Sequence, residues 1–443
     1  MSPPALPAHG LRASLSALAV VLLLHGVQGR TAEAADTESD PAVSATIPPA
    51  PAAPEEAPAR WYDVTSWPVI PVPVIDSDPN SGVTLGVLPT WLRSNDQQQI
   101  NRIIAPDLLY SPNFGLGADF RIFSYPSSNE QWSVTASMKQ RVERGADFEY
   151  ELGRDRQTPW SLSTSLVYDR SGTDRFYGMG NRALKADQTN YTASQAMAQA
   201  SAGYNFNHTW QLQYTLRAKH MDVLPGTISG IPSIQELFPR LNGLGNTNLV
   251  LNRLSLVYDT RDDPTVPTRG ARWVVYSGVA STGSFPVNSS YSEAGLDGRN
   301  YVRLSPIDIL ATHFAIRYMP STGDVPFWAL STLGGANSDI GEQLLRGYGA
   351  GRFYDRDSLS ASVELRHQTF SFDVSATHVD IEVTPFVDAG RVFSHGTADP
   401  FSHLHPVAGV GFRGIARPSV VGYVDIGYGS EGAAVFTGID YPF

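Results

Sequence analysis

The residues with the clearest capacity for metal chemistry are His403 and His405, which lie two positions apart with Asp399 nearby. Imidazole and carboxylate side chains are ligands that Zn²⁺ takes in proteins. The stretch is polar and flanked by prolines, however, and a solvated turn explains it more simply than a metal site. We therefore predict no bound metal and no cofactor.

The sequence contains no recognisable arrangement for catalysis. It has no G-x-S-x-G nucleophile motif, no H-E-x-x-H motif, no phosphate-binding loop and no dinucleotide fingerprint. It also has no cysteine, which excludes a thiol nucleophile, thiolate metal sites and disulfides. We therefore expect that the chain is not an enzyme.

One long segment, residues 334–357, is rich in glycines and arginines, including Arg346. Glycine lets a backbone turn sharply and pack closely, and arginine carries a forked set of donors. Asp388 shares strand parity with Asp380 and Glu382, so all three lie on one polar face, where Asp388 could receive a guanidinium bidentately. Losing one partner would cost about 3–5 kcal/mol if water is excluded. In an open, wet interior the pair would contribute about 0–1 kcal/mol.

Composition excludes a nucleic-acid partner. The net charge is −11 and the isoelectric point is about 5.4, whereas a nucleic-acid interface needs clustered lysine and arginine to neutralise phosphates. Only 17% of the residues are charged, against roughly 25% in an average soluble domain.

The first 66 residues have the features of export and of a linker. Leu15–Leu24 is an apolar run too short to span a membrane, and Ala32-Glu33-Ala34 has the small-x-small pattern of a cleavage site. We predict a signal peptide over residues 1–34, with Val27-Gln28-Gly29 as an alternative site. Residues 35–66 are rich in proline and alanine and cannot bury a core, so we predict a disordered periplasmic linker.

From residue 67 to 443 the chain consists of short runs in which apolar and polar residues alternate. In residues 131–140 the polar Gln131 and Lys139 share one face, while Trp132 and Met138 share the other. Residues 211–219 and 360–366 alternate in the same way. Each strand therefore has one wet face and one apolar face.

Two architectures bury such strands: a soluble sandwich and a membrane barrel with its apolar faces toward lipid. Runs of about 9–12 residues match tilted membrane strands, and aromatic residues at run ends match interfacial girdles. We predict an all-β fold, a single antiparallel transmembrane β-barrel of about 16 strands with a long inward-folding loop. The count from Gly82 onward gives sixteen to eighteen strands, and an even number places both termini in the periplasm.

Three motifs occur in a fixed order. They are Tyr258-Asp259-Thr260-Arg261-Asp262 followed by Gly270, then Leu345-Arg346-Gly347-Tyr348, and then Phe386-Val387-Asp388-Ala389-Gly390. This set resembles the BamA/TamA family of outer-membrane proteins, also called bacterial surface antigens, over roughly residues 67–443. The resemblance implies that Arg346 pairs with Asp388 in a lock between the loop and the lumen. It also implies a Gram-negative host and an integral outer-membrane location.

The last residues partly match the signal by which barrel-assembly machinery recognises clients, through Gly438, Tyr441 and Phe443. We expect the chain to end inside a strand, with Tyr441 and Phe443 on one face. Pro442 cannot donate to a ladder and could weaken the seam between the last strand and the first. An inconsequential strand-end proline explains it equally simply.

The family resemblance implies a barrel that assists insertion or translocation of protein or lipid. The implied partners are outer-membrane lipid and lipopolysaccharide, the barrel-assembly machinery during biogenesis, and an unidentified secreted or membrane client. The region before Trp67 has no room for the periplasmic POTRA domains of BamA and TamA, which weakens this inference. A passive solute pore, or a surface antigen or adhesin acting through external loops such as 172–188 or 223–248, remains an alternative.

Overall fold

The structure is a computed structural model. It describes residues 70–94, 100–127, 129–282, 289–322, 325–336, 342–374, 377–394, 399, 401–416, 420–439 and 441–443. The predicted signal peptide (1–34) and linker (35–66) lie outside the described residues.

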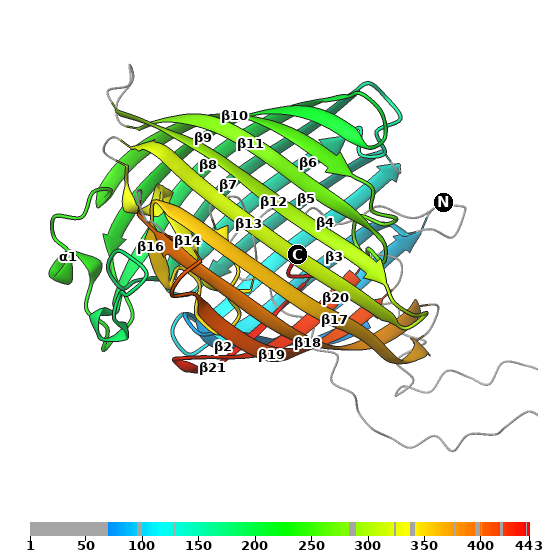
Figure 1. Ribbon diagram of the computed structural model, residues 1–443. Helices are drawn as coiled ribbons and strands as arrows, with labels where there is room; N and C mark the ends of the chain where they lie inside the picture. Colours follow the sequence, from blue (N-terminus) through cyan, green and yellow to red (C-terminus); the bar gives the residue numbers. More distant parts are fainter. Residues whose placement is uncertain are drawn as a thin grey trace, which may run out of the picture.

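The described residues form one 18-stranded antiparallel sheet that curls into a barrel, and each strand pairs with the next barrel strand along the chain (Figure 1). The strands are β1 (Ile70–Asp78), β2 (Gly82–Ser94), β3 (Ile100–Ser111), β4 (Gly115–Ser127), β5 (Glu130–Lys139), β6 (Arg144–Leu152), β7 (Trp160–Phe176), β8 (Thr189–Asn205), β9 (Trp210–Pro225), β10 (Gly245–Asp259), β11 (Gly270–Thr282), β12 (Ser289–Arg303), β13 (Asp308–Thr322), β17 (Asp357–Val374), β18 (Thr377–Phe393), β19 (His405–Ala416), β20 (Val420–Gly429) and β21 (Gly432–Ile439).

This arrangement confirms the predicted all-β antiparallel barrel. The described residues contain eighteen barrel strands, two more than the predicted sixteen, and seventeen of them lie from Gly82 onward, within the counted interval of sixteen to eighteen. The prediction that the first strand begins near Gly82 was wrong, because β1 precedes it and pairs with β2 from Ile70↔Thr90 to Asp78↔Gly82. Prolines at positions 71 and 73 concealed this strand, since proline is rare inside sheets.

The alternation of side chains sets the two faces of the wall. In β5 the Lys139 side chain points inward and is 6% exposed, whereas the neighbouring Met138 points outward and is 62% exposed. Leu108 and Tyr428, on other strands, are likewise exposed on the outer face. A soluble sandwich would bury these apolar side chains, so the exposed apolar belt identifies the outer face of a membrane barrel. Among the described residues, no helix is long and apolar enough to cross a membrane.

The two ends of the barrel differ. The end that we call the loop end carries the connections 177–188 and 226–244 and the described residues 325–336 and 342–356. It also carries the short helix α1 (Ile234–Leu237) and the 3₁₀ turns η2 (Lys185–Asp187) and η3 (Phe327–Ala329). An apolar cluster that includes Phe176, Ile234 and Phe327 packs there. The opposite, terminal end is where β1 begins and β21 ends. Packed apolar side chains therefore join these connections to the strands at the loop end.

The barrel closes where β1 meets β21. Within the described residues these two strands share no backbone ladder. The Ser77 amide donates to the Thr437 hydroxyl over 2.7 Å, and that hydroxyl lies 3.1 Å from a carboxylate oxygen of Asp76. We call this boundary the seam. The Thr437 side chain links the two strands there, whereas every other pair of neighbouring barrel strands is joined by a backbone ladder.

The prediction that the chain ends inside a strand was wrong. Strand β21 ends at Ile439, and Tyr441 and Phe443 lie outside any strand, with Phe443 only 3% exposed. Phe443 packs against Tyr301 and Leu344 in the interior. Pro442 therefore removes no donor from a ladder, and the suggested weakening of the seam by this residue does not occur.

Candidate functional site

The described residues of the connection between β13 and β17, 325–336 and 342–356, fold back into the barrel. It contains β14 (Ser331–Leu333), β15 (Glu342–Gln343) and β16 (Phe353–Asp355), which form a small sheet in the order β15-β14-β16. Figure 1 shows β14 and β16 within the wall near the end that carries α1. The inward fold agrees with the prediction, and the connection also contains these short strands of its own. We call residues 342–356 the lumen segment.

Arg346 is the centre of this segment. Its side chain is fully buried and donates to both carboxylate oxygens of Asp388, over 3.0 Å from Nε and 2.8 Å from a terminal nitrogen. Its backbone amide also donates to Asp388 over 3.0 Å. The structure thus brings together the two residues that the family motifs paired. Asp388 on β18 holds both the main chain and the side chain of the lumen segment.

Two more carboxylates contact the same guanidinium. Glu364 on β17 lies 2.9 Å from it and Asp425 on β20 lies 3.2 Å from it. Arg366 pairs with Glu364 over 2.8 Å, and Arg413 pairs with Asp425 over 2.5 Å. With Arg346 and Asp388, these residues form a network of three guanidinium groups and three carboxylates, all with fully buried side chains.

The charge balance of this network keeps Arg346 ionised. Burial alone lowers the pKa of a guanidinium, because it disfavours the charged form. The carboxylates of Asp388, Glu364 and Asp425 outweigh burial and raise the pKa of Arg346 above its ordinary value. The lumen segment is therefore held by charge and hydrogen bonds together.

Close packing completes the fit. The Arg346 guanidinium carbon lies 3.6 Å from the centre of the Phe386 ring, a cation–π contact from β18. On β20, a Cβ atom at Gly427 would lie 1.9 Å from the Arg346 carbonyl oxygen. A Cβ at Gly347 would come within 2.7 Å of Val407. Glycine is required at positions 347 and 427 for the segment to lie against the wall. Gly390 on β18 is close to the neighbouring strand instead, since a Cβ there would lie 2.9 Å from the Leu359 carbonyl oxygen.

The tip of the lumen segment reaches the turns at the loop end. The Tyr348 hydroxyl lies 2.8 Å from the Ser430 hydroxyl and accepts the Ser430 amide over 3.1 Å. Arg352 donates to Glu431 over 2.6 and 2.8 Å. Ser430 and Glu431 form the turn between β20 and β21. The tip is therefore bound to the hairpin that carries the last strand.

A second ionic anchor was not anticipated from the sequence. Glu293 on β12 lies between Arg253 on β10 and Arg317 on β13, at 2.5 and 2.7 Å. Arg317 also donates twice to the Ala329 carbonyl over 3.1 Å, at the start of the connection. The polar face of the β10–β13 strands was visible in the alternation. No sequence signal indicated that Arg317 would donate to the main-chain carbonyl of Ala329.

The hairpin motif stands apart from this network. Arg261 donates to both oxygens of Asp259, over 3.0 and 2.8 Å. Gly270 has a φ of +96°, which favours glycine. Asp262 accepts main-chain amides of Thr268 and Arg269 over 2.9 and 3.1 Å. Burial raises the pKa of Asp262, but hydrogen bonds, chiefly from Thr268, hold it below its ordinary 3.8. The motif builds a turn at the terminal end.

The predicted C-terminal signal residues take two different positions. Gly438 on β21 faces the Tyr423 ring, which a Cβ would approach to 2.6 Å. The Tyr441 hydroxyl donates to Glu382 over 3.0 Å, and its ring lies 3.6 Å from the guanidinium carbon of Arg366. Arg366 also donates to the Phe443 carbonyl over 3.2 Å. The last residues thus contact the buried ion network, which sequence reasoning missed.

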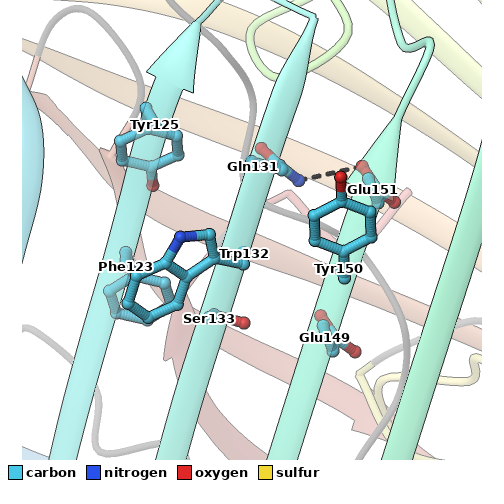
Figure 2. A pocket seen from close by; sticks show the side chains of 8 residues that line it. All are labelled: Phe123, Tyr125, Gln131, Trp132, Ser133, Glu149, Tyr150 and Glu151. Carbon is cyan, nitrogen blue, oxygen red and sulfur yellow. Dashed lines mark hydrogen bonds between the residues drawn. The ribbon is translucent and has the colours of Figure 1, made fainter.

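The other polar clusters lie away from the network. His405 stacks on Phe353, and its ring nitrogen lies 3.0 Å from the Asn181 carbonyl oxygen. Within the described part of the chain, no group of three or more His, Cys, Asp or Glu side chains could hold a metal ion. Figure 2 shows a small pocket on β4, β5 and β6, where Gln131 donates to Glu151 over 2.9 Å. Arg346 lies instead against β17, β18 and β20.

A polar interior, an apolar outer face and an inward-folded segment define an integral β-barrel membrane protein. The Omp85 superfamily domain matches residues 128–413, more than half of the chain. The chain therefore belongs to the Omp85 superfamily and is an outer-membrane β-barrel, which confirms the resemblance carried by the three motifs.

Solved structures that match the chain include BamA from Haemophilus ducreyi lacking POTRA domains 1–3, at 16% identity and a TM-score of 0.49, covering 80% of this chain and 75% of that one. CdiB from Escherichia coli matches at 13% identity with a TM-score of 0.45, covering 84% and 62% of the two chains. CdiB from Acinetobacter baumannii matches at 12% identity with a TM-score of 0.46, covering 80% and 65%. No curated protein sequence matches the chain.

Proposed function

We propose that this barrel assists the insertion or translocation of protein or lipid at the outer membrane, with the lumen segment as a displaceable plug. The observation that carries this proposal is the fully buried network around Arg346, which ties the segment to the inner wall. Within the proposal both termini are periplasmic. The partners are outer-membrane lipid, lipopolysaccharide, the barrel-assembly machinery and a protein or lipid client.

The chemistry of the network supports displacement rather than permanent filling. If the segment filled the lumen permanently, apolar side chains of similar volume would hold it in place at least as well as a buried ion network does. Ionised groups, in contrast, regain hydration when a segment leaves a polar lumen. The wall residues Asp388, Glu364 and Asp425 would then face water, so the empty state is accessible.

Single-channel conductance in a planar bilayer tests the plug. The wild type should be mostly closed, and deletion of residues 341–356 should open it. A variant with a shortened 153–159 turn, at the opposite end of the barrel, serves as the control and should stay closed. A steady, large conductance in both the wild type and the deletion variant would contradict the plug and favour the passive solute pore.

Insertion activity needs its own assay. Vesicles that contain the purified protein should accelerate the folding of a urea-unfolded outer-membrane barrel, measured by its shift in unheated gel electrophoresis. Vesicles containing an unrelated barrel provide the matched comparison. Equal folding rates in the two vesicle preparations would contradict a role in protein insertion.

A further inference from the structure

The seam lies between two hairpins, β1–β2 and β20–β21. Each hairpin has its own backbone ladder, but no ladder joins β1 to β21 within the described residues. Thr437 bridges the two strands through its contacts with Ser77 and Asp76. Because a ladder contributes many hydrogen bonds and this bridge contributes two, other contacts must add to the closure of the barrel.

The lumen segment contacts the β20–β21 side of the seam at its tip. Tyr348 binds the Ser430 hydroxyl and amide, and Arg352 binds Glu431. The ring of Tyr348 also lies against Gly429, where a Cβ would come within 2.9 Å of it. These contacts fix the tip to the turn that joins the last two strands.

The same tip contacts the β1–β2 side. Asn80, in the turn between β1 and β2, is only 6% exposed and donates from its side chain to the Ala350 carbonyl over 2.8 Å. A Cβ at Gly349 would lie 2.4 Å from the Asn80 side-chain oxygen, so the Asn80 side chain lies directly against the main chain of the segment. The Asn80 carbonyl in turn accepts a hydrogen bond from Arg175 over 2.7 Å. Asn80 is therefore held between the segment and the wall.

We propose that residues 348–352 are a clasp that joins the two hairpins across the seam, so that release of the lumen segment and opening of the seam are coupled. Residues 348 and 352 bind one hairpin and residue 350 binds the other, which makes the tip a bridge. When the segment leaves, the loop end of the seam loses this bridge and its closure rests on Thr437. Coupling of this kind is reciprocal, so an open seam also weakens docking of the segment.

Spin-label distances across the seam test the clasp, and the absence of cysteine in the sequence makes labelling specific. Val83 on β2 and Tyr428 on β20 point outward and are 48% and 68% exposed, so cysteines at these positions carry the labels. In the wild type the distance distribution should have one main population. Asn80→Ala should add a population longer by about 5 Å or more, the spacing of one strand.

Asn113→Ala is the matched control. Asn113 also donates to a backbone carbonyl of the β1–β2 turn, that of Ser81, over 3.1 Å, but it lies in the β3–β4 turn. This variant should leave the distance distribution unchanged. An identical distribution in the wild type and in a folded Asn80→Ala barrel overturns the clasp, and so does an equal change in both asparagine variants.

A second variant separates a bridge from two independent contacts. Tyr348→Phe keeps the ring and removes the hydroxyl that binds Ser430. Once Asn80→Ala has cut the bridge, adding Tyr348→Phe should not increase the long-distance population further. An increase equal to the sum of the single effects overturns the clasp, because independent contacts add. The experiment uses the isolated barrel without a client, so it stands whether or not the proposed insertion activity is found.

Discussion

Arg346→Ala should release the lumen segment while the barrel stays folded. The substitution removes a guanidinium that contacts Asp388, Glu364 and Asp425, all with fully buried side chains. Three carboxylates then face only Arg366 and Arg413 within the network. Breaking a buried pair by removing one partner costs about 3–5 kcal/mol. Solvent-exposed ion pairs contribute only about 0–1 kcal/mol to stability, but this range does not apply here because the site excludes water.

This cost falls on the docked state alone, because the carboxylates regain water when the segment leaves. Every 1.4 kcal/mol is about a tenfold change in an equilibrium constant. The ratio of docked to released segment should therefore fall by about 100-fold to several thousand-fold. Strands β17, β18 and β20 keep their ladders, so the free energy of unfolding of the whole barrel should change much less.

Amide hydrogen exchange measures this ratio directly. The Arg346 amide donates to Asp388 and the Leu345 amide donates to the Gly335 carbonyl over 2.9 Å, so both report on docking. Their exchange in Arg346→Ala should accelerate by the factor given above. Arg154→Ala, which breaks a pair with Glu151 at the other side of the barrel, should leave both amides unchanged. Acceleration of less than about threefold in a folded Arg346→Ala barrel would refute the argument.

Two further predictions follow from single contacts. Gly427→Ala should expel the segment as Arg346→Ala does, because a Cβ would lie 1.9 Å from the Arg346 carbonyl oxygen. A raised conductance in planar bilayers checks this prediction. A channel that stays closed would contradict it and show that β20 can shift. The low pKa of Asp262 means that its carboxylate stabilises the 260–269 turn above its ordinary value of 3.8 and loses this effect as the pH falls through the folded-state value. Protection of the Thr268 and Arg269 amides, measured as exchange relative to the intrinsic rate at each pH, should therefore fall at low pH in the wild type but not in Asp262→Asn, and parallel behaviour of the two proteins would contradict this.

The fold could be predicted from the sequence because alternation is a local property. A period of two alone places Trp132 and Met138 on one face and Gln131 and Lys139 on the other, and the strand length and the aromatic residues at run ends indicated that the apolar face is the outer one. The ends of the barrel could not be predicted in this way. Strand β1 contains a proline at position 71, which the local pattern disfavours in a strand. Phe443 would face outward if the alternation of β21 continued, but it lies in the interior, because contacts with Tyr301 and Leu344 override the local pattern.

The site could be predicted in part. Arg346 and Asp388 were found because family motifs mark them and because strand parity puts Asp388 on the inner wall. Parity also puts Glu364 and Arg366 on a polar face, but it carries no information on which residues of different strands share one level of the barrel. That level depends on the shear of the closed sheet, so the place of Asp425 beside Arg346 emerged only from the structure.

The order of the chain has a consequence for how the barrel assembles. Asp388, Glu364 and Asp425 all lie on strands that follow Arg346 in the sequence. The β13–β17 ladder must first close over the whole intervening connection, at an entropic cost that grows only slowly with its length. Three more strands, β18, β19 and β20, must then join the sheet before the network around the Arg346 guanidinium is complete. The complete network around Arg346 can therefore form only once β20 is in place, which makes docking of the segment one of the last events of folding.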